Sequence, residues 1–181
     1  SFAPVAIQYS TSNAGRLRSR GVDADILWMT PLEGLRLGAS VAYTDTKFTK
    51  SYISNAGVDL NGRAAPRAPK WSGNISADWD ILLSDRLKLG LTGLVNYSDS
   101  YFTDANSFND YVQGSYATVD VGASIGSQND SWKISLLANN VTDKIFVNTA
   151  SGRPFQGPGG DDLALNQNRG RLVYLQGAVK F

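Results

Sequence analysis

Eight charged residues recur along the chain at alternating positions and are the first candidates for chemistry. They are Asp23, Asp25, Arg36, Lys70, Asp78, Lys88, Asp120 and Lys133. Carboxylates close to ammonium or guanidinium groups could form an acid–base site. The 181-residue sequence has no Cys and no His, however, which removes thiol nucleophiles, the commonest general base and the commonest metal ligand. We therefore expect no enzyme, no cofactor and no metal site, and we expect the eight side chains to line water.

A second set of candidates lies in long polar segments that carry aromatic side chains. These segments span roughly residues 47–67, 98–114 and 142–170. Aromatic and guanidinium groups in loops could contact an aromatic ligand or a metal chelate. The candidates are Tyr101, Phe102, Phe108, Tyr111, Phe146, Arg153 and Phe155. The same side chains could instead pack the loops against one another or against further strands, and both interpretations stay open.

The stretches between these segments alternate apolar and polar residues with the period of two that is typical of β-strands. Three pairs of such strands, each joined by a short turn, predict hairpins. The hairpins cover residues 22–44, 70–97 and 116–139. A last strand runs from about Arg171 to Phe181, and residues 1–8, which include Pro4, could add a short one. We expect an all-β, antiparallel fold of about eight strands.

Short turns and long loops alternate strictly along this chain. Because successive antiparallel strands reverse direction, all short turns lie at one edge of the sheet and all long loops at the other. This asymmetry is typical of outer-membrane barrels. The net charge is only +1, which provides no field to attract nucleic acid, so we expect no nucleic-acid partner.

Each predicted strand has two alternating sets of residues, an apolar phase and a polar phase. The apolar phase carries no charge, and its aromatic residues lie at the strand ends. They are Trp28, Tyr43, Trp71, Trp79, Tyr97, Trp132 and Phe181. Aromatic rings at both ends of an aliphatic band are typical of the two water–lipid boundaries. The opposite phase has mostly small polar side chains, which suit a wide aqueous lumen lined by the eight charged residues. The alternative is a soluble β-sandwich, whose aromatic residues would more often lie in mid-strand.

Several motifs in this order resemble those of the TonB-dependent outer-membrane receptors, whose barrels have twenty-two strands around a plug domain. Asn13–Ala14–Gly15 and Ser19–Arg20–Gly21–Val22–Asp23 resemble an Asn-x-Gly and Gly-Val-Glu stretch, with Asp in place of Glu. Ala65–Pro66–Arg67–Ala68–Pro69–Lys70–Trp71 resembles a Pro-x-x-Pro-Lys strand entry. Asn139–Asn140–Val141–Thr142–Asp143 resembles an Asn-Leu-Thr-Asp segment, and Phe181 matches an aromatic C-terminus.

The resemblance covers nearly the whole chain and implies that residues 1–181 form the last eight strands of such a barrel, without the plug domain or the TonB box. It implies short periplasmic turns, long extracellular loops and a place in the bacterial outer membrane. The implied function is uptake of a scarce nutrient, most often a ferric siderophore, energised through TonB.

The implied partners are outer-membrane lipid, the rest of the barrel, the plug domain, TonB through the missing plug, and a small ligand such as a metal chelate. Phe181 resembles the signal that the barrel-assembly machinery recognises. A self-contained eight-stranded outer-membrane barrel with a structural or adhesion role is the alternative function.

Overall fold

The computed structural model describes residues 15–53, 57–104, 111–152 and 163–180. The expected short strand at residues 1–8 lies outside these ranges. So do four candidate residues, namely Phe108, Arg153, Phe155 and Phe181.

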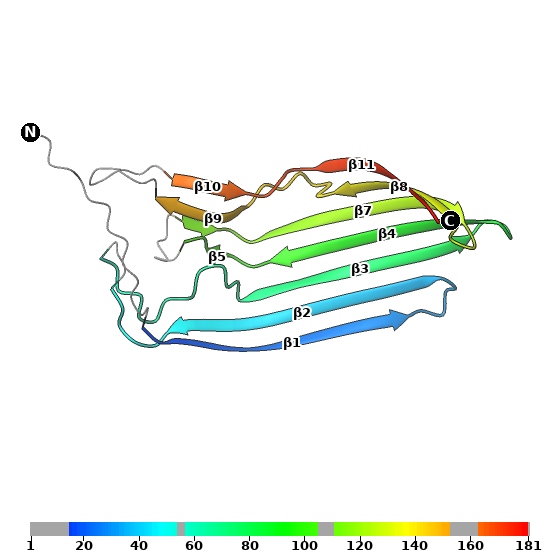
Figure 1. Cartoon of the computed structure of the whole chain (residues 1–181). Helices are drawn as coiled ribbons and strands as arrows, with labels where there is room; N and C mark the ends of the chain where they lie inside the picture. Colours follow the sequence, from blue (N-terminus) through cyan, green and yellow to red (C-terminus); the bar gives the residue numbers. More distant parts are fainter. Residues whose placement is uncertain (1–14, 54–56, 105–110, 153–162, 181) are drawn as a thin grey trace, which may run out of the picture.

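The described chain is all-β, and its main element is one seven-stranded antiparallel sheet (Figure 1). Its strands are β1 (Leu17–Met29), β2 (Leu35–Phe48), β3 (Trp71–Leu82), β4 (Leu87–Ser98), β7 (Tyr116–Ser127), β8 (Trp132–Asn139) and β11 (Leu172–Val179). They lie in the sheet in chain order, with β1 and β11 as its two edges. The predicted fold class and the three hairpins are confirmed.

Two small hairpins lie at the long-loop end of the sheet (Figure 1). One pairs β5 (Tyr101–Phe102) with β6 (Val112–Gln113), and the other pairs β9 (Val147–Gly152) with β10 (Leu163–Gln167). The sequence pattern did not predict them, because strands this short show too few alternations. The long loops are therefore partly folded.

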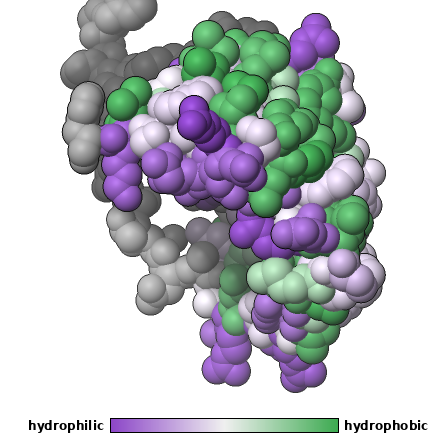
Figure 2. All heavy atoms as spheres, turned by 90° about the vertical axis from the view of Figure 1, so that its right-hand side faces the viewer, coloured by the Kyte–Doolittle hydropathy of each residue, from purple (hydrophilic) through white to green (hydrophobic). Residues whose placement is uncertain are grey.

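The strand register places the whole apolar phase on one face of the sheet. Directly paired residues form rows that cross all seven strands. One row contains Trp28, Leu37, Ala77, Gly93, Val121, Ala138 and Val173. Because side chains alternate in direction along a strand, the polar phase lies on the opposite face. Figure 2, which looks at the short-turn end, shows hydrophobic residues gathered along one side of the wall and hydrophilic residues mainly on the other.

The apolar face is uncovered in the described part of the chain. Val22 and Leu175 are each 72% exposed, and Ile75 is 65% exposed. The buried hydrophobic residues, Phe48, Leu60 and Ala150, lie at or near the long-loop end instead. A soluble sandwich would cover this face with a second sheet, whereas the long strands here form a single layer. No helix among the described residues is long and apolar enough to cross a membrane.

The first short turn shows why particular residues are needed at the strand reversals. Thr30 Oγ1 accepts a hydrogen bond from Leu32 N at 3.2 Å, and Leu35 N donates to Leu32 O at 3.1 Å. Gly34 has a φ of +77°, and a Cβ there would lie 2.0 Å from the carbonyl oxygen of Asp80. Only glycine combines this backbone conformation with so close an approach to β3.

Candidate functional site

The predicted water-lining residues share the face opposite the apolar rows. The strand register places Asp23, Asp25, Arg36, Asp78, Lys88, Asp120 and Lys133 on this face, and Lys70 directly precedes β3. Small polar residues separate them, and some bond across strands, such as Asn74 Nδ2, which donates to Ser40 Oγ at 2.7 Å. The polar face is therefore continuous across the sheet.

The structure brings four of these charged residues together near the short turns. Arg36, Asp78, Lys88 and Lys133 line a hollow of about 220 Å³ on the polar side. Arg36 and Asp78 are direct cross-strand partners, and Gly126 on β7 pairs with both Lys88 and Lys133. Asp23 and Asp25 line a different hollow, farther along the wall.

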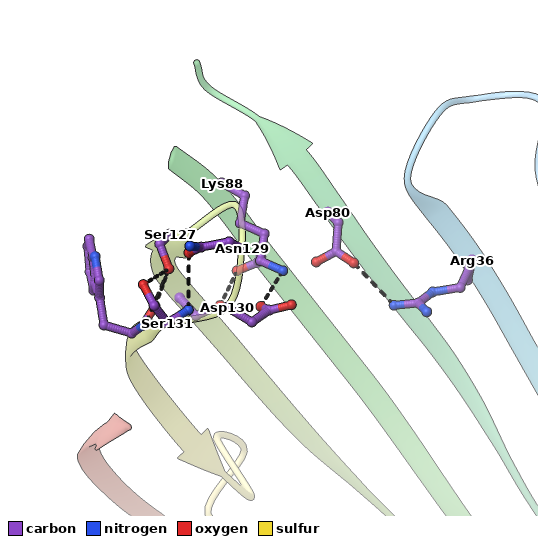
Figure 3. Close-up of polar contacts among 10 residues, drawn as sticks. Arg36, Asp80, Lys88, Ser127, Asn129, Asp130 and Ser131 are labelled. Carbon is purple, nitrogen blue, oxygen red and sulfur yellow. Dashed lines mark hydrogen bonds and ion pairs between the residues drawn. The ribbon is translucent and has the colours of Figure 1, made fainter. Parts of the chain in front are cut away.

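Two carboxylates that the sequence analysis did not select complete the short-turn cluster (Figure 3). Asp80 Oδ2 lies 3.3 Å from Arg36 Nη2, and Asp130 Oδ1 lies 2.5 Å from Lys88 Nζ. The Lys88 ammonium, through its hydrogen bond and its charge, holds the pKa of Asp130 below its usual value. Asp80 repeats the phase of Asp78 and could have been found from the sequence, whereas Asp130 lies in a turn and carries no periodic signal.

Asp120 has a structural role that its sequence position did not indicate. Its Oδ1 atom accepts a hydrogen bond from the backbone N of Asn140 at 2.7 Å. Asn140, at a φ of +50°, begins the turn after β8. The carboxylate thus ties β7 to the first residue beyond β8, so it bonds backbone while it lies on the polar face of the sheet.

The Asn140 side chain bonds across this turn to the backbone of Lys144. Its Nδ2 donates to Lys144 O at 2.9 Å, and its Oδ1 accepts from Lys144 N at 2.9 Å. Asp143 Oδ1 in turn accepts from Arg171 N at 2.7 Å, which links the turn to the start of β11. The motif at residues 139–143 is therefore a structural device that joins β8 to β11.

Two of the predicted ligand contacts lie together at the long-loop end. Tyr101 and Phe102 on β5 line a cavity of about 280 Å³ with Lys70 and Asp99. The cavity also has small apolar walls, contributed by Ala64, Ala68 and Val112. Aromatic faces beside a cation and a carboxylate could hold a flat, polar ligand.

Tyr101 also serves the packing of the loops. Its hydroxyl donates to Val147 O at 2.9 Å. Burial, together with the neighbouring Tyr116, raises the pKa of Tyr101 to about 12. Phe146, another predicted contact, stacks on Tyr116 with ring centroids 4.0 Å apart. Tyr101 and Phe146 therefore have loop-packing partners, as the second interpretation of these residues proposed.

Further hydrogen bonds, most of them between backbone atoms, join all three long loops into one layer. Arg67 N donates to Phe102 O at 2.8 Å, and Ala150 N donates to Thr103 O at 3.3 Å. Gln113 Oε1 accepts from Val147 N at 2.7 Å. Thr103, which is 3% exposed, bonds Tyr111 O through both its backbone and its hydroxyl. Tyr111 thus contributes backbone to the layer and is not among the cavity residues.

The first long loop has a small core of its own. Leu60 is only 2% exposed, and Gly62 N donates to Phe48 O at 2.8 Å. Asp59 accepts from Asn61 N at 3.0 Å and from Ser51 Oγ at 2.9 Å. These hydrogen bonds, the Asn61 bond foremost, lower the pKa of Asp59. The loop is thus held in shape by its own contacts.

The predicted aromatic girdle residues within the described ranges lie at the two ends of the apolar face. Trp28 is 54% exposed and Trp132 36% exposed near the short turns, while Trp71 and Tyr97 are 49% and 47% exposed near the long loops. Tyr43 contacts Trp71 with ring centroids 4.8 Å apart. The indole N–H of Trp79 donates to Glu33 O at 3.3 Å. Several aromatic groups thus lie exposed on the apolar face rather than in a closed interior.

Residues 1–141 match the family described as TonB dependent receptor-like, beta-barrel, and the chain belongs to this family. The members are receptors and transporters of the outer membrane of Gram-negative bacteria, not enzymes, and the chain is therefore an outer-membrane barrel segment.

Three solved structures share the fold. The ferric yersiniabactin uptake receptor FyuA from Yersinia pestis matches with a TM-score of 0.73 and 22% identity, over 93% of this chain and 24% of that one. The ferric preacinetobactin receptor BauA from Acinetobacter baumannii matches with a TM-score of 0.62 and 23% identity, over 89% and 22%. The siderophore receptor PiuA from the same organism matches with a TM-score of 0.62 and 19% identity, over 90% and 22%. The chain spans about a quarter of the length of these structures.

Proposed function

We propose that this chain is part of a receptor that imports a scarce nutrient, a ferric siderophore, across the outer membrane with energy delivered through TonB. The family match over residues 1–141 is the observation that carries the proposal. The ligands of FyuA and BauA, ferric yersiniabactin and ferric preacinetobactin, support the choice of substrate class. In this proposal residues 1–181 are the C-terminal segment of the barrel, and the plug domain belongs to the rest of the receptor.

In this proposal the two faces of the sheet contact different environments. The apolar rows contact lipid, and the aromatic residues at their ends lie at the membrane boundaries. The polar face, with its paired charges near the short turns, lines the lumen and meets the plug domain. Short turns lie in the periplasm and long loops outside, and Phe181 serves as the signal for the barrel-assembly machinery.

The external part of the receptor binds the chelate in this proposal. The cavity beside Tyr101 and Phe102 supports it, because Lys70 at the same cavity suits the negative charge of many metal chelates. Phe108, Arg153 and Phe155, together with Tyr111 and Phe146, are proposed as further contacts or as supports for the contacting loops.

Uptake of radioactive iron tests the function. The complete receptor is expressed in a strain without its own siderophore receptors and supplied with different ferric chelates, with and without a functional TonB. We expect uptake of at least one chelate, lost when TonB is absent. Uptake that persists without TonB, or no uptake of any ferric chelate by a correctly inserted receptor, would contradict the proposal.

The loop cavity is tested separately by binding affinity. The double change Tyr101→Ala with Phe102→Ala removes both rings and should weaken chelate binding about tenfold, since aromatic contacts contribute roughly 0.5–1.5 kcal/mol each. Tyr101→Phe keeps the ring and loses the hydroxyl, with its bond to Val147 O and its interaction with Tyr116, so its binding should stay near the original value. Tyr174→Ala, on β11 and outside the cavity lining, is the aromatic control. Equal affinity of the double variant and the control would refute this site.

A further inference from the structure

Two neighbouring short turns enclose a notch at the short-turn edge of the sheet. The turn before β4 and the turn between β7 and β8 are joined by a hydrogen bond from Gln128 N to Arg86 O at 3.0 Å. The notch has a volume of about 640 Å³, within the range of roughly 300–1,000 Å³ that is usual for small-molecule sites. Its lining includes Ser84, Asp85, Arg86, Leu87, Asn129 and Trp132.

One side of the notch continues the apolar face. Leu87 and Trp132 both belong to the apolar phase, and Trp132, the first residue of β8, is 36% exposed. The hydroxyl of Ser127 fixes this position, because Ser127 Oγ accepts from Trp132 N at 3.1 Å and lies 2.9 Å from Ser131 Oγ (Figure 3). A molecule in the notch would therefore have its apolar part against the face that we propose to be in lipid.

The other side of the notch presents two opposite charges. Asp85 and Arg86 are both exposed, and neither takes part in an ion pair within the described ranges. The neighbouring Lys88, by contrast, is occupied by Asp130 at 2.5 Å. Asn129 Oδ1 accepts from Ser131 N at 3.2 Å, so its amide group is oriented by the turn. The free charges at the notch are thus one cation and one anion side by side.

We propose that this notch binds the phosphoethanolamine headgroup of a membrane phospholipid. The Arg86 guanidinium and the Ser84 hydroxyl bind the phosphate, the Asp85 carboxylate accepts hydrogen bonds from the ammonium group, and Leu87 and Trp132 contact the first part of the acyl chains. A zwitterionic headgroup matches this pair of charges, whereas a purely anionic headgroup would meet the Asp85 carboxylate unfavourably. The inference rests on the proposed lipid contact of the apolar face.

The test uses the complete receptor in detergent, with lipid binding measured by native mass spectrometry during titration with phosphatidylethanolamine, phosphatidylcholine or phosphatidylglycerol. We expect phosphatidylethanolamine to bind most tightly, because the ammonium of phosphatidylcholine carries no N–H donors and phosphatidylglycerol lacks a cation. Arg86→Gln should weaken phosphatidylethanolamine binding about tenfold, as expected for one charge-assisted hydrogen-bonding group. Asp85→Asn should shift the preference toward phosphatidylglycerol.

Lys180→Gln is the matched control, since it removes a positive charge near the same edge of the sheet but outside the notch lining. Its lipid affinities should equal those of the unchanged receptor, and thermal unfolding by circular dichroism should be the same for all variants. Unchanged binding in Arg86→Gln, an unchanged lipid preference in Asp85→Asn, or an equal loss in Lys180→Gln would each overturn the inference.

Failure of this inference is distinguishable from failure of the proposed function. Iron uptake through TonB tests the function and does not require the notch, so Arg86→Gln should transport normally. Quenching of tryptophan fluorescence by brominated lipids tests the lipid contact of the apolar face. A receptor that transports and is quenched, but shows no headgroup preference, would refute only the notch.

Discussion

Replacing Asn140 by alanine should open the turn that follows β8. The Asn140 side chain makes two hydrogen bonds to the backbone of Lys144, both 2.9 Å long, and the residue is 6% exposed. Each bond contributes about 1 kcal/mol. The left-handed backbone at φ +50° costs alanine about 1 kcal/mol more than asparagine. The expected loss is therefore about 3 kcal/mol of local stability.

Amide hydrogen exchange of the complete receptor measures this loss at Lys144, whose N–H donates to Asn140 Oδ1. A change of about 3 kcal/mol corresponds to exchange roughly 150-fold faster. Asn140→Gly loses the same two bonds but accepts the positive φ, so its exchange should rise only about 30-fold.

Asn139→Ala is the matched control for this experiment, because Asn139 is the exposed neighbouring asparagine at the end of β8. Its exchange at Lys144 should stay close to that of the unchanged protein. If Asn140→Ala exchanged no faster than Asn139→Ala, or if the glycine and alanine variants were equal, the reasoning about the side-chain bonds or about the backbone would be refuted.

Three further predictions concern the turns and loops. Gly34→Ala should destabilise the first hairpin by more than about 2 kcal/mol in thermal unfolding, whereas Gly57→Ala, also at positive φ but with open space around its Cβ position, should cost less; equal losses would refute the steric argument. The pKa of Asp130 is lowered in the folded state, so its ionised carboxylate stabilises the fold at pH values above the pKa that Asp130 has in the unfolded chain. This contribution is lost as the pH falls through the pKa of Asp130 in the folded state. Lys88→Met should therefore flatten the acid limb of the pH–stability curve, and an unchanged limb would argue against the ion pair. The pKa of Tyr101 is raised to about 12 in the folded state, so its protonated phenol stabilises the fold fully below pH about 10. This contribution is lost as the pH rises toward about 12. Tyr101→Phe should reduce alkaline sensitivity, measured by loss of loop protection in hydrogen exchange, and an identical alkaline profile would contradict a buried phenol.

The long strands could be predicted from the sequence because each carries several apolar–polar alternations. From Val22 to Trp28, and in the strands that follow, this period indicates both the strand and its face. The beginning of β1 at Leu17 could not be predicted in this way, since Arg18 and Arg20 flank Ser19 and give no apolar alternation. Its pairing with the end of β2 extends the strand instead.

The candidate site was only partly predictable, for a related reason. Tyr101 and Phe102 were selected by residue type, and they do lie at one cavity with Lys70. The bond from Tyr101 to Val147 joins residues 46 positions apart, and no local pattern encodes such a contact. Asp59, Asn140 and Asp143 act through backbone atoms of folded loops, so their roles depend on a conformation that the sequence pattern does not specify.

The order of the strands in the sheet has a consequence for biogenesis. Every long strand pairs with the long strand before it, from β1 to β11, and only the two small hairpins intervene. Such nearest-neighbour topology keeps loop-closure entropy low, because no strand must find a distant partner. The segment can therefore insert into the membrane hairpin by hairpin. The free edge strand of each completed hairpin then pairs with the first strand of the next.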